Sequence, residues 1–69
     1  MDAEFQGLFH RLNNQLGIVL AHAELLESKA TNDIERARAG QVVRSVLDAM
    51  GTSRSIRQHV ELAPQARIS

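Results

Sequence analysis

The chain of 69 residues contains no cysteine, carries no net charge and has no long apolar run. Without cysteine, neither a disulfide framework nor a thiolate metal site is available. Its eight basic and eight acidic residues cancel, which argues against the broad positive surface of a nucleic-acid-binding protein. We therefore predict no nucleic-acid partner.

The sequence also lacks a membrane-spanning segment. The longest apolar stretch, from Leu16 to Leu26, is interrupted by His22 and Glu24 and is far below the ~20 residues that a spanning helix needs. The N-terminal residues Met-Asp-Ala-Glu-Phe lack the positive start of a secretory signal. These absences predict a cytoplasmic protein segment without membrane contact.

The small size of the chain limits its stability. A chain of 69 residues forms one domain at most and rarely buries enough apolar surface to be stable alone. Because disulfides are excluded, we expect association with another chain to supply the missing stability.

Apolar side chains recur at alternating spacings of four and three residues along the first part of the chain. This alternation is typical of the seam of a helical bundle or coiled coil, and it predicts a first helix over about residues 3–29. The seam consists of Phe5, Phe9, Leu12, Leu16, Val19, Ala23, Leu26 and Ala30.

A turn is expected at about residues 30–32, followed by a second helix over about residues 33–62. Asn32 can cap this helix, and Glu35 follows three residues later as in a capping box. Apolar residues then recur at helical spacing until Pro64, whose ring disfavours helix at the preceding residue. We expect the tail, residues 63–69, to be loose.

So short a connection makes the two helices antiparallel neighbours. One hairpin cannot cover both apolar stripes, whereas two hairpins can cover them by forming a four-helix bundle. The predicted fold class is therefore all-α, with residues 1–69 forming an antiparallel two-helix hairpin that dimerises into a four-helix bundle.

Within the first helix stands the run His10-Arg11-Leu12-Asn13-Asn14-Gln15-Leu16, followed by aliphatic residues and Ala23-Glu24-Leu25-Leu26. This stretch resembles the H-box of histidine kinases, and the match covers about residues 5–30. The resemblance implies a dimerisation and histidine-phosphotransfer (DHp) domain of a two-component sensor kinase. Such a domain accepts a phosphoryl group on a histidine, here His10, and passes it to an aspartate in the receiver domain of a response regulator.

His10 lies off the apolar seam, and Asn13, Asn14 and Gly17 follow it on the same outer side at i+3, i+4 and i+7. A neutral imidazole nitrogen is a good nucleophile near neutral pH, and the resulting P–N bond is labile enough to pass the group on. The two asparagines can donate hydrogen bonds to phosphoryl oxygens or to a water. In the family, the residue at the position of Asn14 helps to place the water that removes the phosphoryl group from the regulator.

The second helix brings a small, polar segment to the level of the histidine. With a turn at residues 30 to 31, residue n of the first helix lies level with roughly residue 61 minus n of the second, which places His10 beside Gly51. We expect the segment Gly51–Ser55 to leave room for a docking regulator or ATP-binding domain. Together with Gly7 and Gly17, Gly51 favours a close approach of another backbone near His10.

The sequence departs from the family pattern at Arg11. Family members usually have Glu or Asp after the phosphoacceptor, where the carboxylate takes a proton from the other ring nitrogen. A guanidinium cannot accept a proton at neutral pH, although it can attract phosphate. Where many relatives have proline, this chain has Gln15, and its helix should be straighter there.

No glycine-rich nucleotide box is present, so the chain is expected to hold no cofactor itself. ATP and Mg²⁺ would be supplied by a separate catalytic domain, and whether the chain counts as an enzyme stays open. His22 and His59 are interpreted as ordinary helix residues, and no metal-ligand spacing links the three histidines. Arg54 and Arg57 can assist a phosphoryl group or contact an acidic regulator surface.

Three hypotheses follow. The favoured one is the phosphoacceptor hairpin of a sensor histidine kinase, present as a fragment or working with a separate ATP-binding domain. The second is a degenerate relative that dimerises without accepting phosphate, as Arg11 would permit. The third is a phosphorelay intermediate that exchanges phosphoryl groups only with receiver domains and never uses ATP.

Overall fold

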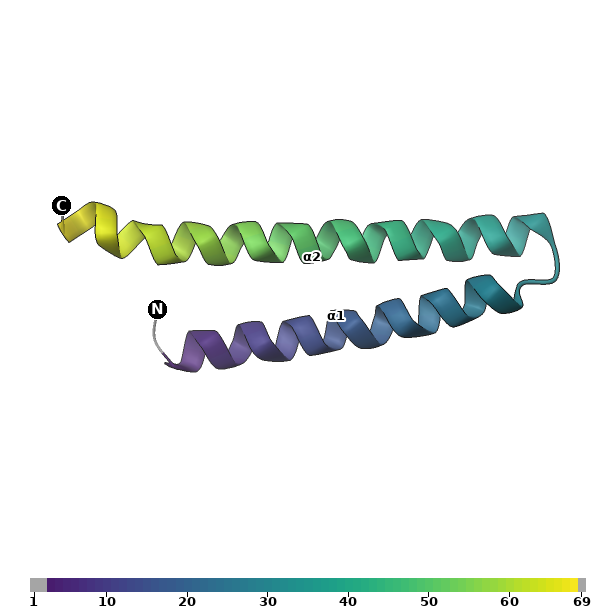
Figure 1. Ribbon diagram of the computed structural model, residues 1–69, viewed down its shortest axis with the longest axis horizontal. Helices are drawn as coiled ribbons and strands as arrows, with labels where there is room; N and C mark the ends of the chain where they lie inside the picture. The colour runs from purple at the N-terminus through teal and green to yellow at the C-terminus, as the bar shows by residue number, and fades with distance from the viewer. Residues whose placement is uncertain (1–2, 69) are drawn as a thin grey trace.

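The computed structural model describes the backbone of residues 3–68 and the side chains of residues 3–61. It contains helix α1, Ala3–Lys29, and helix α2, Asp33–Ile68, and no strand occurs in the described part of the chain. The two helices run antiparallel and are joined by a short turn (Figure 1). The predicted all-α hairpin is confirmed, and α1 has the predicted bounds.

Helix α2 is longer than α1, with 36 residues against 27, and its C-terminal end runs past the start of α1 (Figure 1). The prediction that α2 ends near residue 62 and that the tail is loose was wrong for residues 63–68, which continue the helix through Pro64. Proline removes one backbone donor and disfavours helix at Ala63 but does not forbid it. Extending an existing helix also needs no new nucleus, and Gln65, Ala66 and Arg67 are good helix formers.

The turn is held by side chains of residues 30–36. Asn32 caps α2 as predicted, because its Oδ1 accepts a hydrogen bond from the Glu35 backbone N–H at 2.8 Å. The Glu35 carboxylate accepts hydrogen bonds from the backbone N–H and the hydroxyl of Thr31, each at 3.2 Å, rather than from Asn32 as in a capping box. Arg36 donates to the Ala30 carbonyl at 3.3 Å. These contacts fix the angle at which the chain enters α2.

The predicted seam of α1 divides into two sets that face different directions. Phe9 and Ala23 are buried against α2, and Leu16 and Ala30, at the same heptad position, are half-buried. The alternate set is largely open to solvent: Leu12 is 40% exposed, Val19 46% and Leu26 67%. Within one hairpin, therefore, only half of the seam forms the core, as expected if one hairpin cannot cover both apolar stripes. The burial of the other half in a bundle of two hairpins stays a prediction.

Helix α2 shows the same division. Ala39, Val46 and Ser53 recur every seven residues and are buried against α1. Phe9, the residue before His10, lines one cavity together with Met50 and Ser53, which lie on either side of Gly51 in the sequence. This agrees with the prediction that His10 and Gly51 lie at the same level of the hairpin. Phe9 also packs edge-to-face on Phe5, which lies one turn earlier on α1, with ring centroids 4.8 Å apart.

The core of the hairpin is small. The buried apolar side chains are Phe9, Ala23, Ala39 and Val46. Larger apolar residues, such as Ile18 and Leu47, remain about half exposed in the single hairpin. Among the described residues, neither helix contains a stretch that is apolar enough to cross a bilayer.

Candidate functional site

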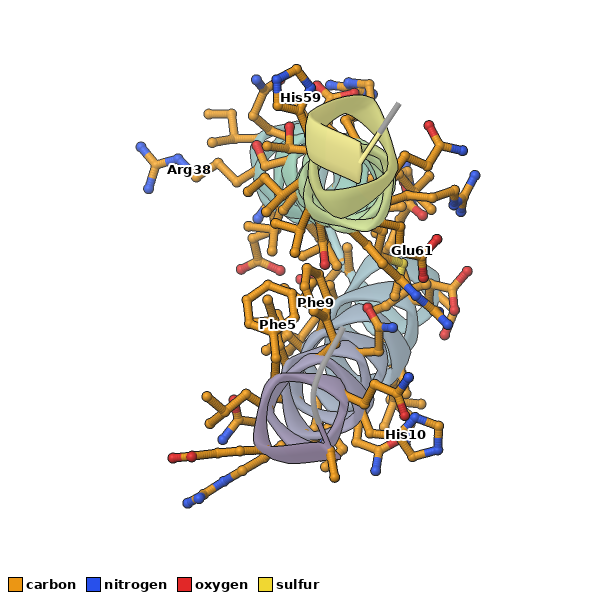
Figure 2. All side chains as sticks on the ribbon, turned by 90° about the vertical axis from the view of Figure 1, so that its left-hand side faces the viewer. Phe5, Phe9, His10, Arg38, His59 and Glu61 are labelled. Carbon is orange, nitrogen blue, oxygen red and sulfur yellow. The ribbon has the colours of Figure 1, made fainter. Side chains whose placement is uncertain are left out.

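His10 emerges from α1 directly after the buried Phe9. Consecutive residues of a helix point about 100° apart, so the burial of Phe9 against α2 turns His10 to the side of the hairpin. Figure 2 looks along the hairpin from its open end and shows Phe9 between the helices and His10 at the side. His10 is exposed and makes no hydrogen bond or ion pair with any described residue.

A shallow depression of about 150 Å³ lies beside His10. Its lining combines one apolar wall with polar and cationic side chains from both helices: Gln6, Phe9, His10, Asn13 and Arg57. The α1 members follow from helical spacing, because positions i−4 and i+3 lie on the same face as position i. No carboxylate lines the depression.

The structure separates the four site residues that the sequence predicts. His10 and Asn13 line the depression together, whereas Arg11 and Asn14 do not, although both are exposed. Asn14 follows Asn13 by one residue, so it points about 100° further around α1, away from α2. Arg11 follows His10 by one residue and is likewise rotated away from α2. Asn13 is therefore the asparagine that shares the depression with His10.

Arg57 is the contribution of α2 to the depression, and it is paired with Glu61. Arg57 Nε and Glu61 Oε1 are 3.1 Å apart, and both side chains are about half exposed. Figure 2 shows Glu61 on the same side of the hairpin as His10. We call Gln6, His10, Asn13, Arg57 and Glu61 the polar flank.

Next to the depression lies a second cavity of about 210 Å³, which shares Phe9, Asn13 and Arg57 with it. Ser53 also lines this cavity; the residue is 4% exposed, and its hydroxyl has no hydrogen-bond partner among the described residues. The prediction that the segment Gly51–Ser55 is open for docking was therefore wrong for Ser53, although its other members are exposed. The sequence signal for this burial was present, because Ser53 continues the seven-residue repeat of Ala39 and Val46.

The glycines near His10 are open on the hairpin itself. A Cβ atom added at Gly7, Gly17 or Gly51 would meet no atom within 4 Å. Packing between α1 and α2 therefore does not require glycine at these positions. The predicted close approach of a backbone is not made by the hairpin, and it stays a prediction about a separate molecule.

The opposite side of the hairpin exposes apolar residues next to charged ones. Leu26 and Val42 line a groove of about 480 Å³ between the helices near the turn, and Lys29, Glu35 and Arg38 line it with them. Leu12 and Val19 continue the heptad position of Leu26 along α1, and Ile56 continues that of Val42 along α2. We call these five apolar residues the apolar flank. Figure 2 shows Arg38 on the side away from His10 and Glu61.

The other histidines do not join the site. His59 points away from α1 in Figure 2 and lines a separate groove with Ile56 and Val60. His22 is exposed on α1 and lines none of the cavities described here. Within the part of the chain that the structure describes, no three His, Asp or Glu side chains are grouped so that they could hold a metal ion.

Neither known protein families, nor curated proteins, nor solved structures contain a match for this chain.

Proposed function

We propose that this hairpin is the dimerisation and phosphoacceptor domain of a cytoplasmic two-component histidine kinase, with His10 as the phosphoacceptor. Two copies form a four-helix bundle. The ring nitrogen of His10 attacks the γ-phosphorus of ATP, so that a P–N bond forms and the P–O bond to the leaving ADP breaks. The phosphoryl group then passes to an aspartate of a receiver domain, which restores His10.

One observation carries this proposal: the hairpin presents an exposed, unpaired histidine on one side and an unpartnered apolar flank on the other. No described residue of the hairpin occupies the ring nitrogens of His10, so no protein contact has to be broken before the imidazole attacks a phosphorus atom. Because the two flanks are on opposite sides, burial of the apolar flank in a bundle leaves His10 accessible to other domains.

The apolar flank supports a second copy of the chain as its partner. Exposed apolar residues that continue along both helices mark an association surface, and the heptad spacing suits another helical hairpin. A bundle of two hairpins would cover Leu12, Val19 and Leu26 and complete the core that one hairpin leaves open.

The separate ATP-binding domain would bring ATP and Mg²⁺. On this chain, Asn13 is placed to donate a hydrogen bond to phosphoryl oxygens at His10. Arg11 contributes positive charge near the incoming group, but it cannot take the proton from the second ring nitrogen. Asn14, on the more outward side of His10, is available to a docked receiver domain.

The test is to supply the chain with a cognate ATP-binding domain and with a phosphorylated receiver domain, in separate reactions, and to follow acid-labile, base-stable phosphate. His10→Gln should abolish labelling without lowering helicity, because the side chain is outside the core. His22→Gln is the matched control, since it changes another exposed histidine on the same helix. Equal labelling of wild type and His10→Gln would exclude His10 as the phosphoacceptor.

One observation favours a second candidate, a phosphorelay intermediate that does not use ATP. The residue after His10 is Arg11 and not a carboxylate, and no described Asp or Glu lines the depression. Neither place therefore supplies a base for phosphorylation by ATP. In the same pair of reactions, this candidate is labelled by the phosphorylated receiver and not by ATP. A degenerate hairpin would be labelled by neither, although it would still dimerise.

A further inference from the structure

Arg57 belongs to the other helix but lines the same depression as His10. Side chains of a helix lean toward its N-terminus. Helix α2 begins at the turn and ends at the open end of the hairpin (Figure 1). Its side chains therefore lean away from the open end, toward the level of His10. Arg57 therefore leans toward the site that a group attached to His10 would occupy.

The present partner of Arg57 holds it weakly. Glu61 follows Arg57 by four residues, and an acidic residue after a basic one is the less favourable order for such a pair in a helix. Both side chains are about half exposed, so the pair is screened by solvent. A phosphoryl group carries more charge than a carboxylate and offers three acceptor oxygens, which suit the planar donors of a guanidinium.

We propose that Arg57 is a phosphoryl-binding residue: when His10 is phosphorylated, the Arg57 guanidinium leaves Glu61 and binds the phosphoryl oxygens, with the Asn13 amide as a second donor. This proposal rests on the proposed function of His10 and adds a binding group from α2 to it. The anion site is thus built from both helices of one hairpin, and Glu61 is the resting counter-ion of Arg57.

Arg54 provides a matched comparison. It is exposed, has the same charge and lies one turn before Arg57 on α2, but it lines only the neighbouring cavity and not the depression beside His10. Substitution of Arg54 therefore removes one positive charge from the same region without removing the proposed contact.

The experiment uses potassium phosphoramidate, a small reagent that needs no partner protein. Its P–N bond breaks, ammonia leaves, and a new P–N bond forms to a histidine ring nitrogen. The 69-residue chain is treated with the reagent, and the phosphohistidines are assigned by ³¹P and ¹⁵N NMR. The readout is the pH midpoint at which the phosphohistidine formed at His10 takes up its next proton, on its free ring nitrogen. Phosphorylated His22 of the same sample is the internal reference.

A bound guanidinium disfavours the added positive charge of the protonated ring. The His10 midpoint should therefore lie below that of His22 in the wild type, and Arg57→Gln should raise it by about half a pH unit, the size expected for a partly exposed charge pair. Arg54→Gln should leave it within about 0.1–0.2 unit, as expected for a screened charge without direct contact. Glu61→Gln, which frees Arg57, should not raise it.

Two failures are distinguishable. If His10 is phosphorylated but its midpoint is the same in wild type and Arg57→Gln, Arg57 does not bind the phosphoryl group, and the phosphoacceptor function is unaffected. If the reagent labels His22 and His59 while His10 stays unmodified, His10 is not an available nucleophile, and both proposals are excluded. Circular dichroism of each variant shows that the comparison is made between equally helical proteins.

Discussion

The polar and apolar flanks lie on the same two helices but differ in the kind of side chain that they expose to solvent. The apolar flank exposes carbon surface to water, and in the proposed bundle this surface is covered by the apolar flank of a second copy. The polar flank leaves an imidazole and a weakly held guanidinium, which are stable in water and free to react or to bind an anion. Comparison of the flanks thus separates the residues proposed to assemble the protein from the residues proposed to carry its chemistry.

The difference arises from small rotations around α1. Phe9 is buried, His10 turns to the polar flank, and Leu12 turns to the apolar flank, all within one helical turn. A substitution on one flank should therefore leave the other flank largely intact. Three substitutions probe the apolar flank, the buried Ser53 between the helices, and the glycine at the level of His10.

The largest effect is expected from a charge on the apolar flank. Val19→Asp should weaken dimerisation at least ~100-fold, because an unpaired buried charge costs several kcal/mol. Analytical ultracentrifugation across a concentration series measures this change. Ile18→Asp is the matched control, since Ile18 is also exposed and β-branched but lies outside the apolar flank. A wild-type protein that remains a stable, helical monomer at micromolar concentration would contradict the proposed bundle.

A smaller effect, and a stabilising one, is expected from a substitution of Ser53, which lies between the two flanks. Its buried hydroxyl has no hydrogen-bond partner among the described residues, so Ser53→Ala should raise the free energy of unfolding by about 1 kcal/mol. Urea denaturation at one fixed protein concentration measures it. Ser55→Ala carries the same change of side chain at an exposed position and corrects for helix propensity. Equal gains in the two variants would mean that the Ser53 hydroxyl is satisfied in solution.

The smallest effect concerns the glycine at the level of His10. Gly51→Ala should stabilise the protein by ~0.4–1 kcal/mol, since the new methyl group meets no atom within 4 Å. Gly40→Ala should gain less, because its Cβ would come within 2.9 Å of Glu27 Oε2 and the carboxylate must move. Thermal unfolding compares the two variants.

The glycine variants also test what approaches the polar flank. If Gly51→Ala is more stable but accepts the phosphoryl group from its partner domains more slowly, the glycine leaves space for those domains. If transfer is unchanged, the open space at Gly51 has no part in docking.

The periodicity of the sequence was sufficient to predict the hairpin. The bounds of α1 follow from the regular spacing of its apolar residues, and the start of α2 follows from the cap at Asn32, because both depend on residues within one or two turns. The prediction at Pro64 failed, since a local rule about one residue could not account for the length of helix already formed before it.

The direction that each apolar residue faces was decided by the tertiary structure. In a heptad repeat the two core positions are equivalent within one helix, so the sequence could not show that Phe9 would be buried and Leu12 exposed in the single hairpin. The presence of Arg57 beside His10 in one depression has the same origin. It depends on the rotation of one helix relative to the other, which is set by contacts across the hairpin and not by either helix alone.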